Sequence, residues 1–290
     1  MKHTVILIRL SILIALLALV ASAAGVFGQG SGQPLDFTSL RGETVQLYGH
    51  GLYKYDSVSG AAQMMGQDVV TLVLGVPLLI AAILLTRRGS LRGRLLLTGA
   101  LGYFLYTYAS MAFLTAFNSL FLVYVALFSL SLFAFILALS GLDPDFVTQH
   151  IGKGFPRTGI IVLLFGLAAF LSLAWLKRIW TVMQGPAGVN GLESYTTLVI
   201  QALDLGVIVP TALLTAVLLL KKRAWGYALS SVLLFKATLF GAALIAMIVS
   251  QMLAGVPLEP VISALFVLII LAGIILTFLM LRSVREVSHD

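Results

Sequence analysis

Residues 69–94 read VVTLVLGVPLLIAAILLTRRGSLRGR, an apolar run followed directly by a basic loop. The run Val69–Thr86 is long enough to cross a hydrocarbon core of about 30 Å as an α-helix, at about 1.5 Å per residue. Lys and Arg collect in the cytoplasmic loops of membrane proteins, so the four arginines after the run mark its cytoplasmic end. This stretch therefore predicts a transmembrane helix that enters the cytoplasm near residue 87.

Seven other apolar runs of comparable length occur along the 290 residues, separated mostly by short loops. Only 10 % of the residues are charged and 60 % are hydrophobic, whereas soluble domains carry about a quarter charged residues. The fold class predicted is all-α: a polytopic transmembrane bundle of about eight spans, in the cell membrane and in contact with the lipid bilayer. The other runs are 10–27, 95–117, 120–139, 158–176, 196–220, 227–251 and 261–281.

The chain divides into three parts. Residues 1–27 are either a first transmembrane helix or a signal peptide, because a basic start, a Leu-rich run and the small residues Ala21-Ser22-Ala23 fit both. Residues 28–66 are polar and start with a Gly/Ser/Pro stretch, so we expect an external cap loop. Residues 67–290 form the helix bundle.

The positive charges predict the orientation. Thirteen Lys and Arg residues fall on one side of the expected spans and four on the other, with Lys236 inside a span. Since the side rich in Lys and Arg is cytoplasmic, both termini are predicted to lie in the cytoplasm. These basic residues set topology, so nucleic acid is not expected as a partner.

An internal repeat is suggested when the chain is aligned without gaps against itself so that Pro77 falls on Pro210, each within a span. In this alignment, called the repeat shift below, Gly93 falls on Gly226 just after a basic loop. Tyr103 falls on Lys236, each at a polar position in an apolar helix. The alternative is chance, because apolar helices match one another easily. A true repeat of this kind gives two parallel four-helix halves, with a site expected between them.

Catalytic motifs are missing from the sequence. There is no cysteine, the four histidines lie outside the apolar runs, and neither HExxH, GxSxG, a Walker loop nor GxGxxG occurs. We therefore expect no catalytic residue, no metal and no cofactor.

Two ionisable residues lie deep in apolar runs and are the main candidates for a ligand site. Asp204 and Lys236 each cost roughly 2.5–3.5 kcal/mol at mid-helix on insertion scales. The functional interpretation is a substrate or ion site. The structural one is an ion pair, or a lysine that reaches toward the interface.

Four further residues are candidate ligand contacts. Gln201 precedes Asp204 in the same run, and Tyr103 and Tyr106 share a helix face at i, i+3. Asp68 opens the second span, where a carboxylate suits a helix N-terminus. The simpler interpretation of each is a packed tyrosine, or a polar residue at the membrane interface.

Several stretches resemble those of uncharacterised bacterial multi-pass integral membrane proteins. The resemblance spans most of Leu47–Gln251 and brings no activity with it, so it assigns no site residue. The stretches are LYGHGLYKYDS, QDVVTLVLGVPLL, RRGSLRGRLLLTGALGYFLYTYAS and ALDLGVIVP.

Three functions fit these observations. The first is binding or translocation of a small solute, ion or lipid through an outward-facing polar cavity. The second is a non-catalytic partner protein (a subunit, assembly factor or sensor) that uses small-residue faces such as Gly99, Gly102 and Ala109. A membrane enzyme comes third, because Asp68, Asp204 or Glu259 would have to act without metal or histidine.

Overall fold

The computed structural model describes residues 2–28, 30–184 and 191–286. Within these residues, eight helical stretches are long and apolar enough to cross a membrane, as predicted for an all-α bundle. They are Thr4–Phe27, Val58–Arg87, Leu91–Leu114, Phe121–Ser140, Arg157–Gln184, Val199–Leu220, Ala224–Leu253 and Pro260–Ser283.

The first four spans form a closed ring. Helix α1 (Lys2–Phe27) packs on α2 (Val58–Val70), on α3 (Val76–Arg87) and on α5 (Phe121–Ser140). Helix α4 (Leu91–Leu114) completes the ring between α3 and α5. One continuous cluster of buried apolar side chains fills this half and extends to Phe235, Leu239 and Ala243 of a later span.

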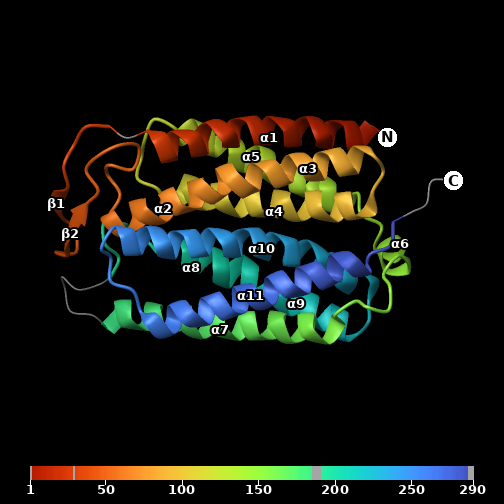
Figure 1. Ribbon diagram of the computed structural model, residues 1–290. Helices are drawn as coiled ribbons and strands as arrows, with labels where there is room; N and C mark the ends of the chain where they lie inside the picture. Colours follow the sequence, from red (N-terminus) through yellow and green to blue (C-terminus); the bar gives the residue numbers. More distant parts are fainter. Residues whose placement is uncertain (1, 29, 185–190, 287–290) are drawn as a thin grey trace.

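The last four spans form a second ring with the same order of neighbours. Helix α7 (Arg157–Gln184) packs on α9 (Val209–Leu220) and on α11 (Pro260–Ser283). Helix α10 (Ala224–Leu253) packs between α9 and α11 and surrounds a second apolar cluster with them. The halves meet where α10 packs on α2 and α4, and they lie one above the other in Figure 1.

The repeat shift that the sequence suggested is present in the backbone. A π-helical turn, η1 (Thr71–Gly75), joins α2 to α3, and a second, η2 (Asp204–Ile208), joins α8 (Val199–Leu203) to α9. Pro77 and Pro210 are each the second residue of the helix that follows. Because proline cannot donate a hydrogen bond and crowds the preceding turn, a wider turn before it accommodates the ring.

The turns that follow also match under this shift. Ser90 N–H donates to the Leu85 carbonyl, and Arg223 N–H donates to the Leu218 carbonyl. Gly89 and Lys222, at matching positions, both have positive φ, which ends a helix in the Schellman manner. The two halves therefore share one backbone design, and equivalent spans run in the same direction in Figure 1.

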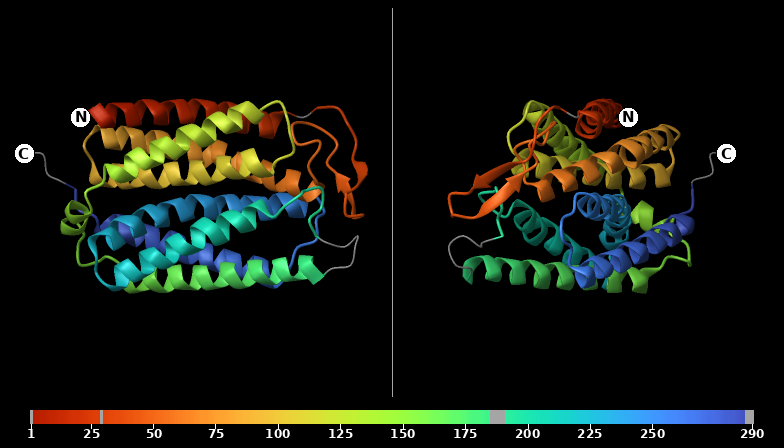
Figure 2. Two further views of the ribbon diagram at one scale, coloured as in Figure 1. Left: turned by 180° about the vertical axis from the view of Figure 1, so that it is seen from behind. Right: turned by 60° about the vertical axis from the view of Figure 1, so that its left-hand side comes forward.

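The segment expected to form an external cap is small. Strands β1 (Leu35–Thr38) and β2 (Thr44–Leu47) form an antiparallel hairpin beyond one end of the helix bundle, as both views of Figure 2 show. The second span begins at Val58, well before its apolar run, because Ser57 caps α2 and small residues such as Gly60 and Ala61 pack inside. At the opposite end lie the basic loops, the N-terminus and the short helix α6 (Pro144–Gln149).

The paired glycines Gly93 and Gly226 yield a test of the repeat. A methyl group added at either would overlap a backbone nitrogen of the preceding helix, that of Thr86 or that of Leu219. We expect Gly93→Ala and Gly226→Ala each to destabilise the protein by about 1–3 kcal/mol, measured by thermal unfolding in detergent. Gly166→Ala, in open space on α7, should cost nothing or stabilise slightly. Equal effects of all three would show that the tight turn is not required.

Candidate functional site

Asp204 lies at the interface of the two halves, with both carboxylate oxygens hydrogen-bonded. The Tyr106 hydroxyl of α4 donates to Oδ1 at 2.6 Å, and the Trp175 indole Nε1–H of α7 donates to Oδ2 at 2.8 Å. Asp204 is the first residue of η2, where the widened turn directs it toward α4 and α7. Only 6 % of the residue is exposed, so these two neutral donors replace water around the carboxylate.

Lys236 lies beside the same tyrosine, although it makes no ion pair with Asp204 within 4.0 Å in the described part of the chain. Its ammonium nitrogen lies 4.3 Å from the centroid of the Tyr106 ring and 4.6 Å from that of Phe240. A cation over aromatic faces gains on the order of 2 kcal/mol when it is desolvated. Tyr106 therefore connects the two charges, its hydroxyl on the acid and its ring under the lysine.

A neutral network occupies the matching position of the first half. Gln67 Nε2 donates to the Tyr103 hydroxyl at 2.6 Å and to Thr107 Oγ1 at 3.2 Å. The hydroxyls of Thr71 and Tyr103 lie 2.9 Å apart. All four residues come from α2, η1 and α4, and they satisfy one another without a charge.

The two networks are equivalent under the repeat shift. Thr71 opens η1 as Asp204 opens η2, and Tyr103 has the place on α4 that Lys236 has on α10. A hydrogen-bonded hydroxyl pair in one half thus corresponds to an acid and a base in the other. At these two positions of the repeat, only the second half carries ionisable side chains.

The structure separates some of the residues that the sequence grouped together. Tyr103 and Tyr106 lie one turn apart on α4 but have different partners: Tyr103 contacts Gln67 of α2, whereas Tyr106 contacts Asp204 of η2, because α4 lies between the two halves. The Gln201 side chain is buried, yet it makes no hydrogen bond with other described residues. Trp175 of α7, which is not among the six candidate ligand residues, is a direct partner of Asp204.

Asp68 is not at a helix N-terminus, because α2 begins well before it, at Val58. It is buried in the first half, where the Tyr53 hydroxyl of the cap donates to its Oδ2. Gly25 of α1 faces this carboxylate so closely that a methyl group there would overlap it. Under the repeat shift, Asp68 matches Gln201, so this carboxyl is also specific to one half.

A second polar cluster joins the halves at the end of the bundle that carries the cap. Asp56 Oδ1 accepts from the Ala116 N–H at 2.8 Å and from the Tyr195 hydroxyl at 3.1 Å. Burial raises the pKa of the Asp56 carboxyl to about 6, and the two hydrogen bonds oppose that rise. The Ser57 hydroxyl donates to Glu193, so two adjacent cap residues hold the loop before α8.

Two cavities lie away from the candidate residues. They measure about 750 and 70 Å³ and are at the basic end, and none of the six candidate ligand residues lines either. The small-residue face expected for a partner is occupied inside the fold, since Gly99 packs on α10 and Gly102 on α5 and Lys236. The region around Asp204 is therefore packed in this conformation.

No protein-family model, no curated protein and no solved structure matches the chain. Fold and site therefore rest on the residues and contacts described above.

Tyr106→Phe tests the link between the halves. It removes the hydroxyl from Asp204 but keeps the ring under Lys236, so we expect a loss of about 1–3 kcal/mol in thermal or denaturant unfolding. Tyr108→Phe is the matched control, because the Tyr108 hydroxyl is buried without a hydrogen-bond partner among the described residues. A loss in the control as large as in Tyr106→Phe would contradict the assignment.

Asp56 predicts a pH dependence of stability. Its pKa is raised in the folded state, so the folded protein binds the proton more tightly, and stability falls as pH rises from about 4 through about 6. The free energy of unfolding is expected to change by up to about 3 kcal/mol over this pH range. Asp56→Asn should remove this component, measured as the difference between the two unfolding curves from pH 4 to pH 7. Parallel curves over that range would contradict the prediction.

Proposed function

We propose that this integral membrane protein translocates a small solute or ion, coupled to protonation of Asp204, by relative movement of its two halves. The observation that carries the proposal is the acid–base pair Asp204 and Lys236 at the position where the other half has a neutral hydroxyl pair. Ionisable residues inside membrane spans are rare, and in transport proteins they mark ion and proton pathways.

The interface between the halves is partly apolar and partly polar. Phe235, Leu239 and Ala243 of α10 belong to the apolar cluster of the first half, and Leu91 and Leu95 of α4 belong to that of the second. Movement between the halves therefore has to slide these apolar contacts, because pulling them apart exposes area or opens cavities. The hydrogen bond between Tyr106 and Asp204 can exchange partners at lower cost, so we place the rearrangement there.

The immediate surroundings of Asp204 support its role as the proton carrier. Both of its partners are neutral donors, and Lys236 contacts aromatic rings rather than the carboxylate. Protonating Asp204 therefore changes the charge of the interface without breaking a direct ion pair. The π-helical turn that carries Asp204 is followed by Pro210, and such turns are recurrent features of functional sites in helices.

The packed conformation sets a requirement for this mechanism. Because Asp204 is buried and both of its carboxylate oxygens are hydrogen-bonded, access for a solute needs the halves to separate at one end. The rival role is purely structural: Asp204, Tyr106 and Lys236 would then do no more than hold the halves together.

Charge movement in proteoliposomes on a solid-supported membrane distinguishes the two roles. We expect the wild type to give a transient current after a pH step, alone or with a panel of amino acids, sugars and inorganic ions. Asp204→Asn should abolish the current while the protein stays folded, because amide replaces the proton-binding group. Thr71→Val, the matching position of the other half, is the control and should retain the current.

Two outcomes would reject the proposal. One is a wild type without current under any of these conditions. The other is an Asp204→Asn variant with full current. A large drop in the thermal midpoint of Asp204→Asn, reversed by adding Lys236→Met, would identify the structural role instead, because removing one buried charge strands the other.

A further inference from the structure

An open groove lies at the basic end, where the two halves meet. Its volume is about 750 Å³, and it runs between the α3–α4 turn of the first half and the end of α11 in the second. Its apolar wall is made by Leu85, Leu96, Phe278 and Leu281. Arginines line its rim, so the groove combines a surface suited to hydrocarbon with positive charge beside it.

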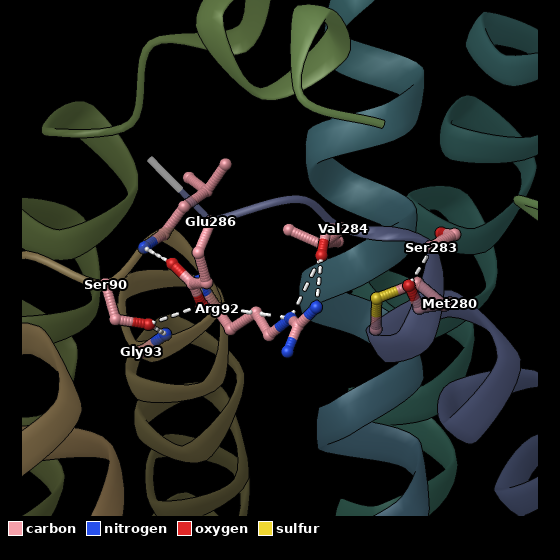
Figure 3. A network of polar contacts seen from close by, with 8 residues as sticks. Ser90, Arg92, Gly93, Met280, Ser283, Val284 and Glu286 are labelled. Carbon is pink, nitrogen blue, oxygen red and sulfur yellow. Dashed lines mark hydrogen bonds and ion pairs between the residues drawn. The ribbon is translucent and has the colours of Figure 1, made fainter. Parts of the chain in front are cut away.

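One part of this rim is already neutralised by the chain itself. Glu286 accepts from the Ser90 hydroxyl at 2.7 Å and from the Leu91 N–H at 2.9 Å, at the N-terminus of α4 (Figure 3). It also forms an ion pair with Arg92 at 3.8 Å. Arg92 in turn donates to the Val284 carbonyl from Nε and from Nη2, at 3.0 and 2.6 Å. This network fixes the tail after α11 against the start of α4.

The other two arginines of the groove remain available to a ligand. Neither Arg88 nor Arg282 has a carboxylate within 4.0 Å in the described part of the chain. The Arg282 guanidinium lies over the Phe278 ring, 4.2 Å from its centroid, which holds it along the apolar wall. Arg88 is exposed at the end of α3. The groove thus has two cationic side chains above four apolar ones.

We propose that this groove binds an anionic phospholipid. Its phosphate lies between Arg88 and Arg282, and its acyl chain lies along Leu85, Leu96, Phe278 and Leu281. Guanidinium groups match phosphate in charge and geometry, and basic pockets between transmembrane helices are typical lipid-headgroup sites. A soluble anion would use the arginines and leave the apolar wall exposed. A lipid satisfies both parts.

The repeat explains why the site occurs once. The turn of the second half places Lys221 where Arg88 stands and Arg223 where Ser90 stands, and Arg223 gives no side-chain cap to α10. Beside that turn the Arg157 side chain donates to the Leu219 and Leu220 carbonyls, so a cation from the start of α7 stands there instead of a carboxylate from the tail. The lipid site therefore depends on the meeting of α11 with the α3–α4 turn, and it is independent of Asp204.

Thermal unfolding with added lipid tests this assignment. Purified protein in detergent is titrated with phosphatidylglycerol, with phosphatidylcholine, and with glycerol phosphate as the headgroup alone. We expect phosphatidylglycerol to raise the melting temperature at concentrations where the other two do not. The double variant Arg88→Gln with Arg282→Gln should weaken this apparent affinity on the order of tenfold. Both side chains lie at the surface of the groove, and the melting temperature without lipid reports whether the variant is folded.

The matched control is Arg87→Gln with Lys221→Gln, which removes the same charge at the same end but outside the groove. It should keep the phosphatidylglycerol response. Equal stabilisation by phosphatidylcholine, or equal loss in both double variants, would overturn the proposal, because neither outcome requires this groove. Stabilisation by glycerol phosphate alone would overturn the lipid assignment and identify a site for soluble phosphates.

Discussion

The hydrogen bond from Tyr106 to Asp204 connects the two halves of the molecule within the spans Leu91–Leu114 and Val199–Leu220. Tyr106 belongs to the first ring of helices and Asp204 to the second, and the Tyr106 ring also carries Lys236. In water such a bond would be worth little, because solvent competes for both partners. In the bilayer no solvent is available, so a carboxylate without partners is strongly penalised. The position of η2 relative to α4 follows from this requirement.

The comparison of the two halves separates backbone design from chemistry. A widened turn, a proline shortly after it, and a tight glycine-dependent loop recur at matching positions of the repeat. On this shared backbone, Thr71 and Tyr103 are replaced by Asp204 and Lys236. The fold needs only that these positions be satisfied, which the hydroxyl pair achieves without charge. The fold therefore does not require charged residues at these positions. That the second half nevertheless buries two of them favours a function for them.

The sequence predicted the fold in most respects, because hydropathy and span length leave few alternatives in a bilayer. The eight spans and the matching positions of Pro77 and Pro210 follow from patterns visible along the chain. The start of the second span at Val58 was not predicted, because its first turns are rich in Gly, Ala and Gln and so are less hydrophobic than the rest of the span. Helix propensity and the Ser57 cap, rather than hydropathy, set that boundary.

Site contacts were harder to predict than site residues. Asp204, Lys236 and Tyr106 stood out because a polar group in an apolar helix is rare, and the structure brings these three together. Trp175 gave no such signal, since tryptophan near a span end is ordinary. Tyr103 and Tyr106 have different hydrogen-bond partners because different helices surround α4, and the packing of helices is not visible in the sequence of α4 alone. The repeat shift could have identified Thr71 as the counterpart of Asp204, because the ungapped alignment pairs every residue of the second span with a residue of the sixth.

Polar links between the halves occur at three depths, and their arrangement constrains any movement. At the end that carries the cap, predicted to be the outer one, Asp56 binds Tyr195 and Ser57 binds Glu193. At the inner end, Glu286 and Arg92 tie the tail after α11 to the start of α4. A rocking motion about the Tyr106–Asp204 bond would break the polar links at one end of the bundle and keep those at the other end. The outer set includes a carboxyl with its pKa near 6, and the inner set borders the groove, so protons and lipid would act on opposite ends of the same movement.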